Sequence, residues 1–198
     1  MKKTLYLSVV VAFILLMGTN AMAAAPQWKI DPPHANIYFG VHHIYSTIKG
    51  HFNDFDGTIR FDPDDLKDSR FDFKVKVDSI DTNNTERDKH LKTADFFDAD
   101  QYPEMTFKSK SIAHKTGDQY EVDGILTVKD VSRTVKVPFT YSGSRQHPLN
   151  PKWIVAGFEA RMTIDRLTYH VGSGKFYQMG AVGKEVKVLI SMEATREK

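Results

Sequence analysis

The sequence predicts an all-β protein of about eight antiparallel strands, arranged as a barrel or a sandwich. First, apolar and polar residues alternate along most of the chain, a period that buries one face of each strand and leaves the other in water. Second, turn-forming residues separate the alternating runs, at 62–65, 116–118 and 147–151. Third, only residues 81–107 break the alternation, and a helical pattern replaces it there.

Three runs in the first half of the chain show the strand pattern. Their apolar positions are filled by aromatic and β-branched residues, which strands prefer. The expected buried sets are Ile37, Phe39 and Val41; Phe55, Gly57, Ile59 and Phe61; and Phe71, Phe73, Val75 and Val77.

The second half repeats the pattern. Residues 120–128 and 131–141 are predicted to form a hairpin around Lys129 and Asp130. The other expected buried sets are Met105 and Phe107; Ile154, Ala156, Phe158, Ala160, Met162 and Ile164; and Val186, Val188, Ile190 and Met192. Closure into a barrel removes exposed strand edges. The opposite face is rich in Lys, Asp and Arg, which favours a barrel in water over one facing lipid.

The N-terminus predicts export. Lys2 and Lys3 precede an apolar run over residues 5–17, and Ala21 and Ala23 supply the small residues of a cleavage site. The run is shorter than the roughly 20 residues of a membrane span. We therefore expect a signal peptide at 1–23, a single domain at 24–198, a periplasmic location and no integral span after cleavage.

Composition excludes several classes of protein. The chain has no cysteine, which rules out disulfides, a lipoprotein anchor and thiol chemistry. Its net charge is +2, and the sequence shows no basic stripe of the kind that nucleic-acid binding requires. We expect no nucleic-acid partner. A homodimer through an exposed strand edge stays open.

The break at 81–107 predicts a short helical insert between strands. Asn84 or Thr85 is a suitable N-cap, and Asp88 follows Thr85 at the spacing of a capping box. Pro103 ends the insert, because the residue before a proline avoids helical geometry. A helix this short is not stable alone. Phe96 or Phe97 must therefore pack against the barrel, either as a plug or as part of a ligand wall.

A series of motifs runs in order along the mature chain. They are Trp28-Lys29-Ile30-Asp31-Pro32 with His34, Gly50-His51-Phe52, Phe55-Asp56-Gly57-Thr58-Ile59, Ser79-Ile80-Asp81-Thr82, Arg87-Asp88, His90-Leu91-Lys92, Asp95-Phe96-Phe97, Tyr102-Pro103, Gly124-Ile125-Leu126-Thr127-Val128 and Ile164-Asp165-Arg166. In this order they resemble the YceI-like family of exported polyisoprenoid-binding proteins. The resemblance implies a lipocalin-like, eight-stranded antiparallel barrel with an elongated apolar cavity, and a binding protein rather than an enzyme. After Arg166 the chain departs from the family's aromatic-glycine pattern, so the loop at 169–180 is expected to close the mouth differently.

The barrel interior is the leading candidate site. Thirteen Phe and eight Tyr can either fill a lumen or line one, and the residues alone leave both outcomes open. The resemblance favours a cavity for a long isoprenoid (polyprenyl or quinone-like) or another amphiphilic or fatty lipid, with no cofactor. Each buried methylene contributes about 0.8 kcal/mol, so a few isoprene units offset the cost of association. The predicted cavity wall is Phe39, Val41, Phe73, Val75, Phe96, Phe97, Phe107, Leu126, Phe158 and Met162.

A polar set accompanies the insert. Arg87, Asp88, His90 and Arg166 form either a head-group site or a structural network. An arginine fork suits a phosphate. The structural interpretation is favoured, because capping already accounts for Asp88.

The histidines carry the alternative function, a periplasmic enzyme or a metal- or haem-binding protein that uses His34, His42 and His43. Neighbouring residues on one strand point to opposite faces, so His42 and His43 do not easily share an ion. The sequence shows neither zinc-ligand spacing nor a G-x-S-x-G nucleophile motif. We expect a hydrogen-bonded structural His34, no metal site and no catalytic residue.

Overall fold

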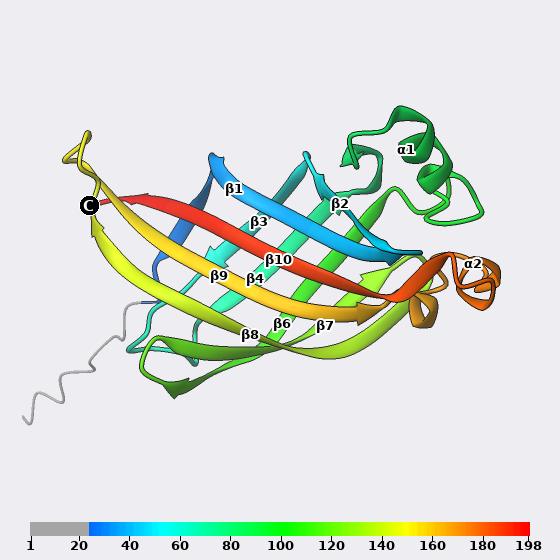
Figure 1. The fold of residues 1–198 in the computed structure, drawn as a ribbon. Helices are drawn as coiled ribbons and strands as arrows, with labels where there is room; N and C mark the ends of the chain where they lie inside the picture. Colours follow the sequence, from blue (N-terminus) through cyan, green and yellow to red (C-terminus); the bar gives the residue numbers. More distant parts are fainter. Residues whose placement is uncertain (1–23) are drawn as a thin grey trace, which may run out of the picture.

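The computed structural model describes residues 24–198; the predicted signal peptide lies outside the described residues. Ten strand segments form one antiparallel sheet (Figure 1). They are β1 (Gln27–His43), β2 (Ser46–Phe52), β3 (Phe55–Arg60), β4 (Arg70–Lys76), β5 (Ile80–Asp81), β6 (Glu104–Thr116), β7 (Gln119–Val128), β8 (Val131–Gln146), β9 (Trp153–Asp165) and β10 (Val182–Glu197). The helical elements are η1 (Val77–Ser79), α1 (Thr85–Lys92), η2 (Arg166–Tyr169) and α2 (Lys175–Gln178).

The sheet closes on itself as an eight-stranded barrel. β10 pairs with β9 on one side and with β1 on the other. β2 and β3 both pair antiparallel with β1, so they are the two halves of one strand bent at residues 53–54. β4 and β5 pair with β3 and β2 in the same way, with η1 at the bend. The predicted fold class is therefore confirmed, as is the hairpin around Lys129 and Asp130, where Val128 faces Val131.

Aromatic rings fill one end of the barrel. Phe61 is 1% exposed and lies at the centre of this packing. Its ring centroid is 4.9–5.8 Å from those of five other rings, which belong to Phe71, Tyr120, Phe139, Tyr141 and Phe158. The indole Nε1 of Trp28 donates a hydrogen bond to the Phe61 carbonyl oxygen at 3.0 Å. We call this the closed end.

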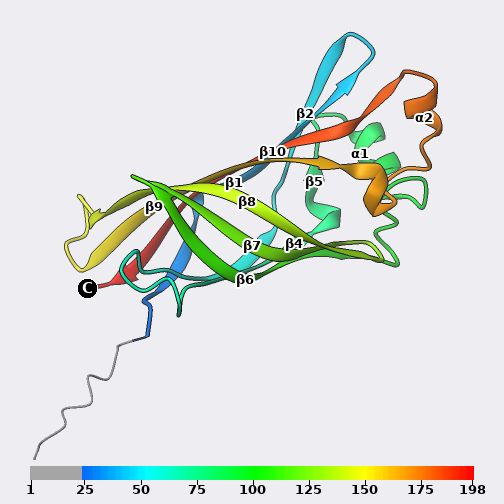
Figure 2. The same ribbon diagram turned by 90° about the horizontal axis from the view of Figure 1, so that it is seen from below.

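The two helices lie together at the other end of the barrel, which we call the open end (Figures 1 and 2). Asn84 is the N-cap of α1, and its side chain accepts from the backbone N–H of Arg87. The predicted capping box is wrong, because Asp88 points to Thr82 instead of back to the helix start. The helix also stops at Lys92, since the next residue, Thr93, is extended.

Candidate ligand-binding cavity

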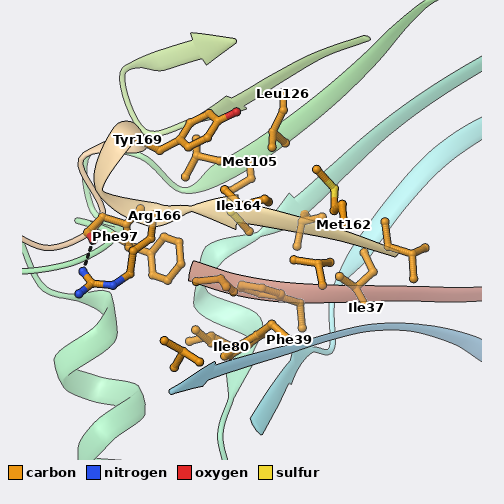
Figure 3. A pocket seen from close by; sticks show the side chains of 18 of the residues that line it. Ile37, Phe39, Ile80, Phe97, Met105, Leu126, Met162, Ile164, Arg166 and Tyr169 are labelled. Carbon is orange, nitrogen blue, oxygen red and sulfur yellow. Dashed lines mark hydrogen bonds between the residues drawn. The ribbon is translucent and has the colours of Figure 1, made fainter. Parts of the chain in front are cut away.

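A cavity of about 590 Å³ occupies the barrel between the closed end and the two helices. This size lies within the ~300–1,000 Å³ that is usual for small-molecule sites. The interior is therefore not filled by side chains. All ten residues predicted for the wall line this cavity, and Figure 3 shows several of them. They are Phe39, Val41, Phe73, Val75, Phe96, Phe97, Phe107, Leu126, Phe158 and Met162.

Strand alternation and two glycines keep the lumen open. Phe39 lies opposite Gly50 on β2, and a Cβ on Gly50 would lie 2.4 Å from the Phe39 ring. Gly124 on β7 lies diagonally across from Phe107 on β6, and a Cβ on Gly124 would also lie 2.4 Å from the Phe107 ring. Each glycine lets a ring lie flat along the wall, whereas a side chain there would push the ring into the lumen.

Arg87 and Asp88 have a structural role. Arg87 donates from Nε to the Thr82 hydroxyl and from Nη2 to the Thr82 carbonyl oxygen, both at 2.7 Å. Asp88 Oδ1 accepts from the Thr82 amide at 3.0 Å and from its hydroxyl at 2.5 Å. Together they hold α1 against the segment after β5. Among residues 24–198, no ion pair joins them to each other.

Arg166 is also structural, although it lines the cavity. The side chain is buried, and it donates to the carbonyl oxygens of Val171 at 2.7 Å, Gly183 at 2.9 Å and Val182 at 3.3 Å. Burial lowers the pKa of its guanidinium, and the charge of Asp165 partly opposes that shift. Arg166 therefore clamps the segment that carries α2 onto the barrel.

Aromatic stacking joins α1 to α2 across the mouth. The Phe96 ring stacks on the Phe176 ring with 5.8 Å between the centroids, and the His90 ring packs edge-on against Phe96 with 5.1 Å between the centroids. His90 Nε2 lies 3.1 Å from Asp95 Oδ2, which gives this predicted polar residue a partner within the insert. Phe96 is buried and also borders the cavity, so its ring packs as a plug at the mouth.

The neighbouring ring, that of Phe97, is half-buried. Its ring meets Phe52 edge-on at 6.3 Å, and it also borders the cavity. Both rings therefore pack within the barrel mouth and border the cavity, and their contact with a ligand stays a prediction.

Several residues of the site were not predicted. Thr82, Lys129 and Phe176 all shape the mouth, with Lys129 Nζ donating to the carbonyl oxygens of Phe96 at 2.8 Å and His170 at 3.0 Å. Their roles depend on distant segments folding together. Local spacing therefore held no signal for them.

The histidines fall into two separate places. His34 Nδ1 lies 2.8 Å from Asp31 Oδ2, which confirms the hydrogen-bonded His34. That hydrogen bond and the charge of Asp31 raise the pKa of His34. Glu193 lies nearby, and the three side chains place possible ligand atoms within 4.8 Å of one another. His42 is exposed while His43 borders the cavity, so the two point to opposite faces.

The fold and the cavity define a closed antiparallel barrel with an apolar interior and a helical mouth. The model of the YceI-like domain matches residues 28–194, and the chain belongs to that family. Protein YceI of Escherichia coli is 35% identical over 189 residues, which cover 94% of this chain and 95% of that protein. A UPF0312 protein of Photorhabdus laumondii is 36% identical over 201 residues and covers 100% of both chains.

Solved structures share the barrel. Burkholderia cenocepacia BcnA has a TM-score of 0.75 and 26% identity, over 84% of this chain and 99% of that one. The Campylobacter jejuni YceI protein has a TM-score of 0.69 and 26% identity, over 79% of this chain and 90% of that one. A polyisoprenoid binding domain from Saccharophagus degradans has a TM-score of 0.62 and 12% identity, over 87% of this chain and 98% of that one. At this identity the similarity is one of fold alone.

Within residues 24–198, every helix is too short or too polar to cross a bilayer.

Proposed function

We propose that this protein is an exported, periplasmic, non-enzymatic carrier that holds a long-chain isoprenoid or a similar amphiphilic lipid inside the barrel. The observation that carries this proposal is the cavity itself, about 590 Å³ and walled almost entirely by aliphatic and aromatic side chains. Such a wall buries the apolar surface of a ligand but makes few directional polar contacts with it. It therefore selects a lipid by the length and shape of its hydrocarbon chain. The polyisoprenoid binding domain from Saccharophagus degradans, built on the same fold, supports this ligand class.

The arginines that line the cavity favour a neutral head group over a diphosphate. Arg87 is bound to Thr82, Arg166 to three carbonyl oxygens and Lys129 to two. A diphosphate needs cations that are free to donate. It would have to break these bonds and leave buried carbonyl groups unpaired, which costs free energy. A polyprenol or a quinone can bind without breaking these hydrogen bonds.

Native mass spectrometry of protein purified from its own periplasm tests the proposal. We expect a retained neutral lipid. The delipidated protein should also take up a polyprenol at least tenfold more tightly than the diphosphate of equal chain length. A protein that comes out free of lipid and takes up neither compound would overturn the carrier function. Preference for the diphosphate would overturn only the neutral head group.

A second candidate, metal binding, rests on the grouping of Asp31, His34 and Glu193. One imidazole and two carboxylates suit several divalent ions. Elemental analysis and an absorption spectrum of the same preparation separate the two functions. A stoichiometric metal lost on His34→Gln would favour this candidate.

A further inference from the structure

Large hydrophobic side chains are exposed at the mouth of the barrel. Of the six exposed on the described residues, four lie on the β1–β2 turn and on or just after α2. Tyr45 is 97% exposed, Met179 67%, Ile44 49% and Tyr177 45%. We call these four residues the mouth rim. Isolated exposed apolar residues need no explanation, but a group at one place marks an interaction surface.

The rim is one surface although its halves are far apart in sequence. The backbone N–H of Ile44 donates to the carbonyl oxygen of Ala181 at 3.1 Å, and His43 pairs with Val182. Both ribbon views show the β1–β2 turn projecting beside α2 at the open end (Figures 1 and 2). Met179 belongs to the rim and also lines the cavity. An apolar path therefore leads from the lumen to the outside.

The backbone at Ile44 is strained. Its φ is 49°, in the left-handed region that β-branched residues rarely adopt. Asparagine or glycine would relieve that strain. Strain of this kind is concentrated at functional positions. An isoleucine with a strained backbone and a side chain that is about half exposed does not stabilise the fold.

The charge of the rim fits an anionic partner. Residues 42–49 and 171–181 contain Lys49 and Lys175 but neither Asp nor Glu. The acidic side chains Glu86 and Asp95 belong to α1 and the turn after it, where Lys89 and His90 pair with them. Tyrosine, aliphatic side chains and lysine on one surface are the combination that settles at a membrane interface.

We propose that the mouth rim docks on the surface of an anionic bilayer, so that lipid passes between membrane and cavity without crossing water. This inference rests on the proposed carrier function. The lysines would draw the open end to the surface, and Tyr45 and its neighbours would enter the headgroup region. Binding should weaken as salt screens the lysines.

Vesicle flotation with phosphatidylethanolamine and phosphatidylglycerol tests the docking. We expect the double variant Tyr45→Asp/Tyr177→Asp to lose at least tenfold in vesicle affinity and in the rate of lipid transfer to vesicles. Neither tyrosine lines the cavity, so uptake of a polyprenol from dilute detergent should be unchanged. Leu149→Asp is the matched control, since Leu149 is 89% exposed on the β8–β9 loop at the opposite end, and it should bind as wild type. Ile44→Asn should melt at a higher temperature and yet bind vesicles less.

The outcomes separate the two proposals. No polyprenol uptake by wild type would overturn the carrier function. Normal uptake together with equal vesicle binding by wild type and the double variant would overturn the docking. Light scattering tests whether the mouth rim instead binds a second copy of the chain. If the wild type is a dimer, the double variant is a monomer and neither binds vesicles, the rim is a dimer interface and the docking proposal is overturned.

Discussion

The two ends of the barrel are built from the same strands and the same alternation, yet one is solid and the other hollow. At the closed end, rings from four different strands meet around Phe61, which is the residue after β3. At the open end, Gly50 and Gly124 let Phe39 and Phe107 lie flat, and the helices cover the lumen without filling it. Stability is therefore expected to reside at the closed end and ligand capacity at the open end.

Removing the central ring of the closed end should have the largest effect. Phe61→Ala leaves a cavity where five other rings met, and we expect it to cost about 3–5 kcal/mol in the free energy of unfolding. Urea denaturation measures this loss. Tyr45→Ala, which removes an exposed ring at the open end, is the control and should change stability little. Equal losses in both variants would contradict the contrast between the ends.

Releasing the clamp on α2 should come next. Arg166→Met leaves three carbonyl oxygens without their donor, at a cost of roughly 2–3 kcal/mol. Hydrogen exchange should quicken in residues 171–183 and stay unchanged around Phe61. Arg166→Lys should rescue little, because an ammonium group does not reproduce the guanidinium fork. Full rescue by lysine would show that charge alone holds the segment.

Phe97→Asp tests the open end as a ligand wall. The side chain is half-buried and borders the cavity, so we expect a cost of about 1–2 kcal/mol but a loss of at least tenfold in lipid affinity. Circular dichroism and polyprenol titration measure the two effects. Unfolding of the variant would mean that Phe97 acts as a plug. Unchanged affinity would remove it from the wall.

The smallest effect should be the pH dependence of stability that comes from His34, an exposed residue on β1. The folded-state pKa of His34 is raised by Asp31, so this pair stabilises the fold below pH 6.5 and the contribution fades as pH rises through the raised pKa. The melting temperature of wild type minus that of His34→Gln should be small and positive at pH 5.5 and approach zero at high pH. The reverse trend would contradict the assignment.

Sequence periodicity predicted the strands and which side chains on them face the cavity, because a period of two decides which face of a strand a residue occupies. Phe96 and Phe97 lie on the insert and not on a strand, so their place at the cavity came from the argument that a short helix must pack. The hydrogen-bond partner of Asp88 could not be predicted from local spacing. Capping rules compare residues three apart, whereas its partner Thr82 precedes the helix and is placed by β5. The sequence placed Arg166 in one polar set with Arg87, but two of its three acceptors, the carbonyl oxygens of Val182 and Gly183, come from a segment that only the folded chain brings near. The short helix α2 was not predicted, because it lies within residues 169–180, which were expected to form a loop.

The central claim is that the hollow end of this barrel holds a neutral isoprenoid chain. A crystal structure of the delipidated protein saturated with a polyprenol tests it most directly. We predict an extended chain inside the lumen, with its tail against the Phe71 ring, its middle beside Phe97 and its hydroxyl at the mouth near Phe176. A lumen closed by side chains, or a lipid bound only on the outer face of the sheet, would contradict the claim.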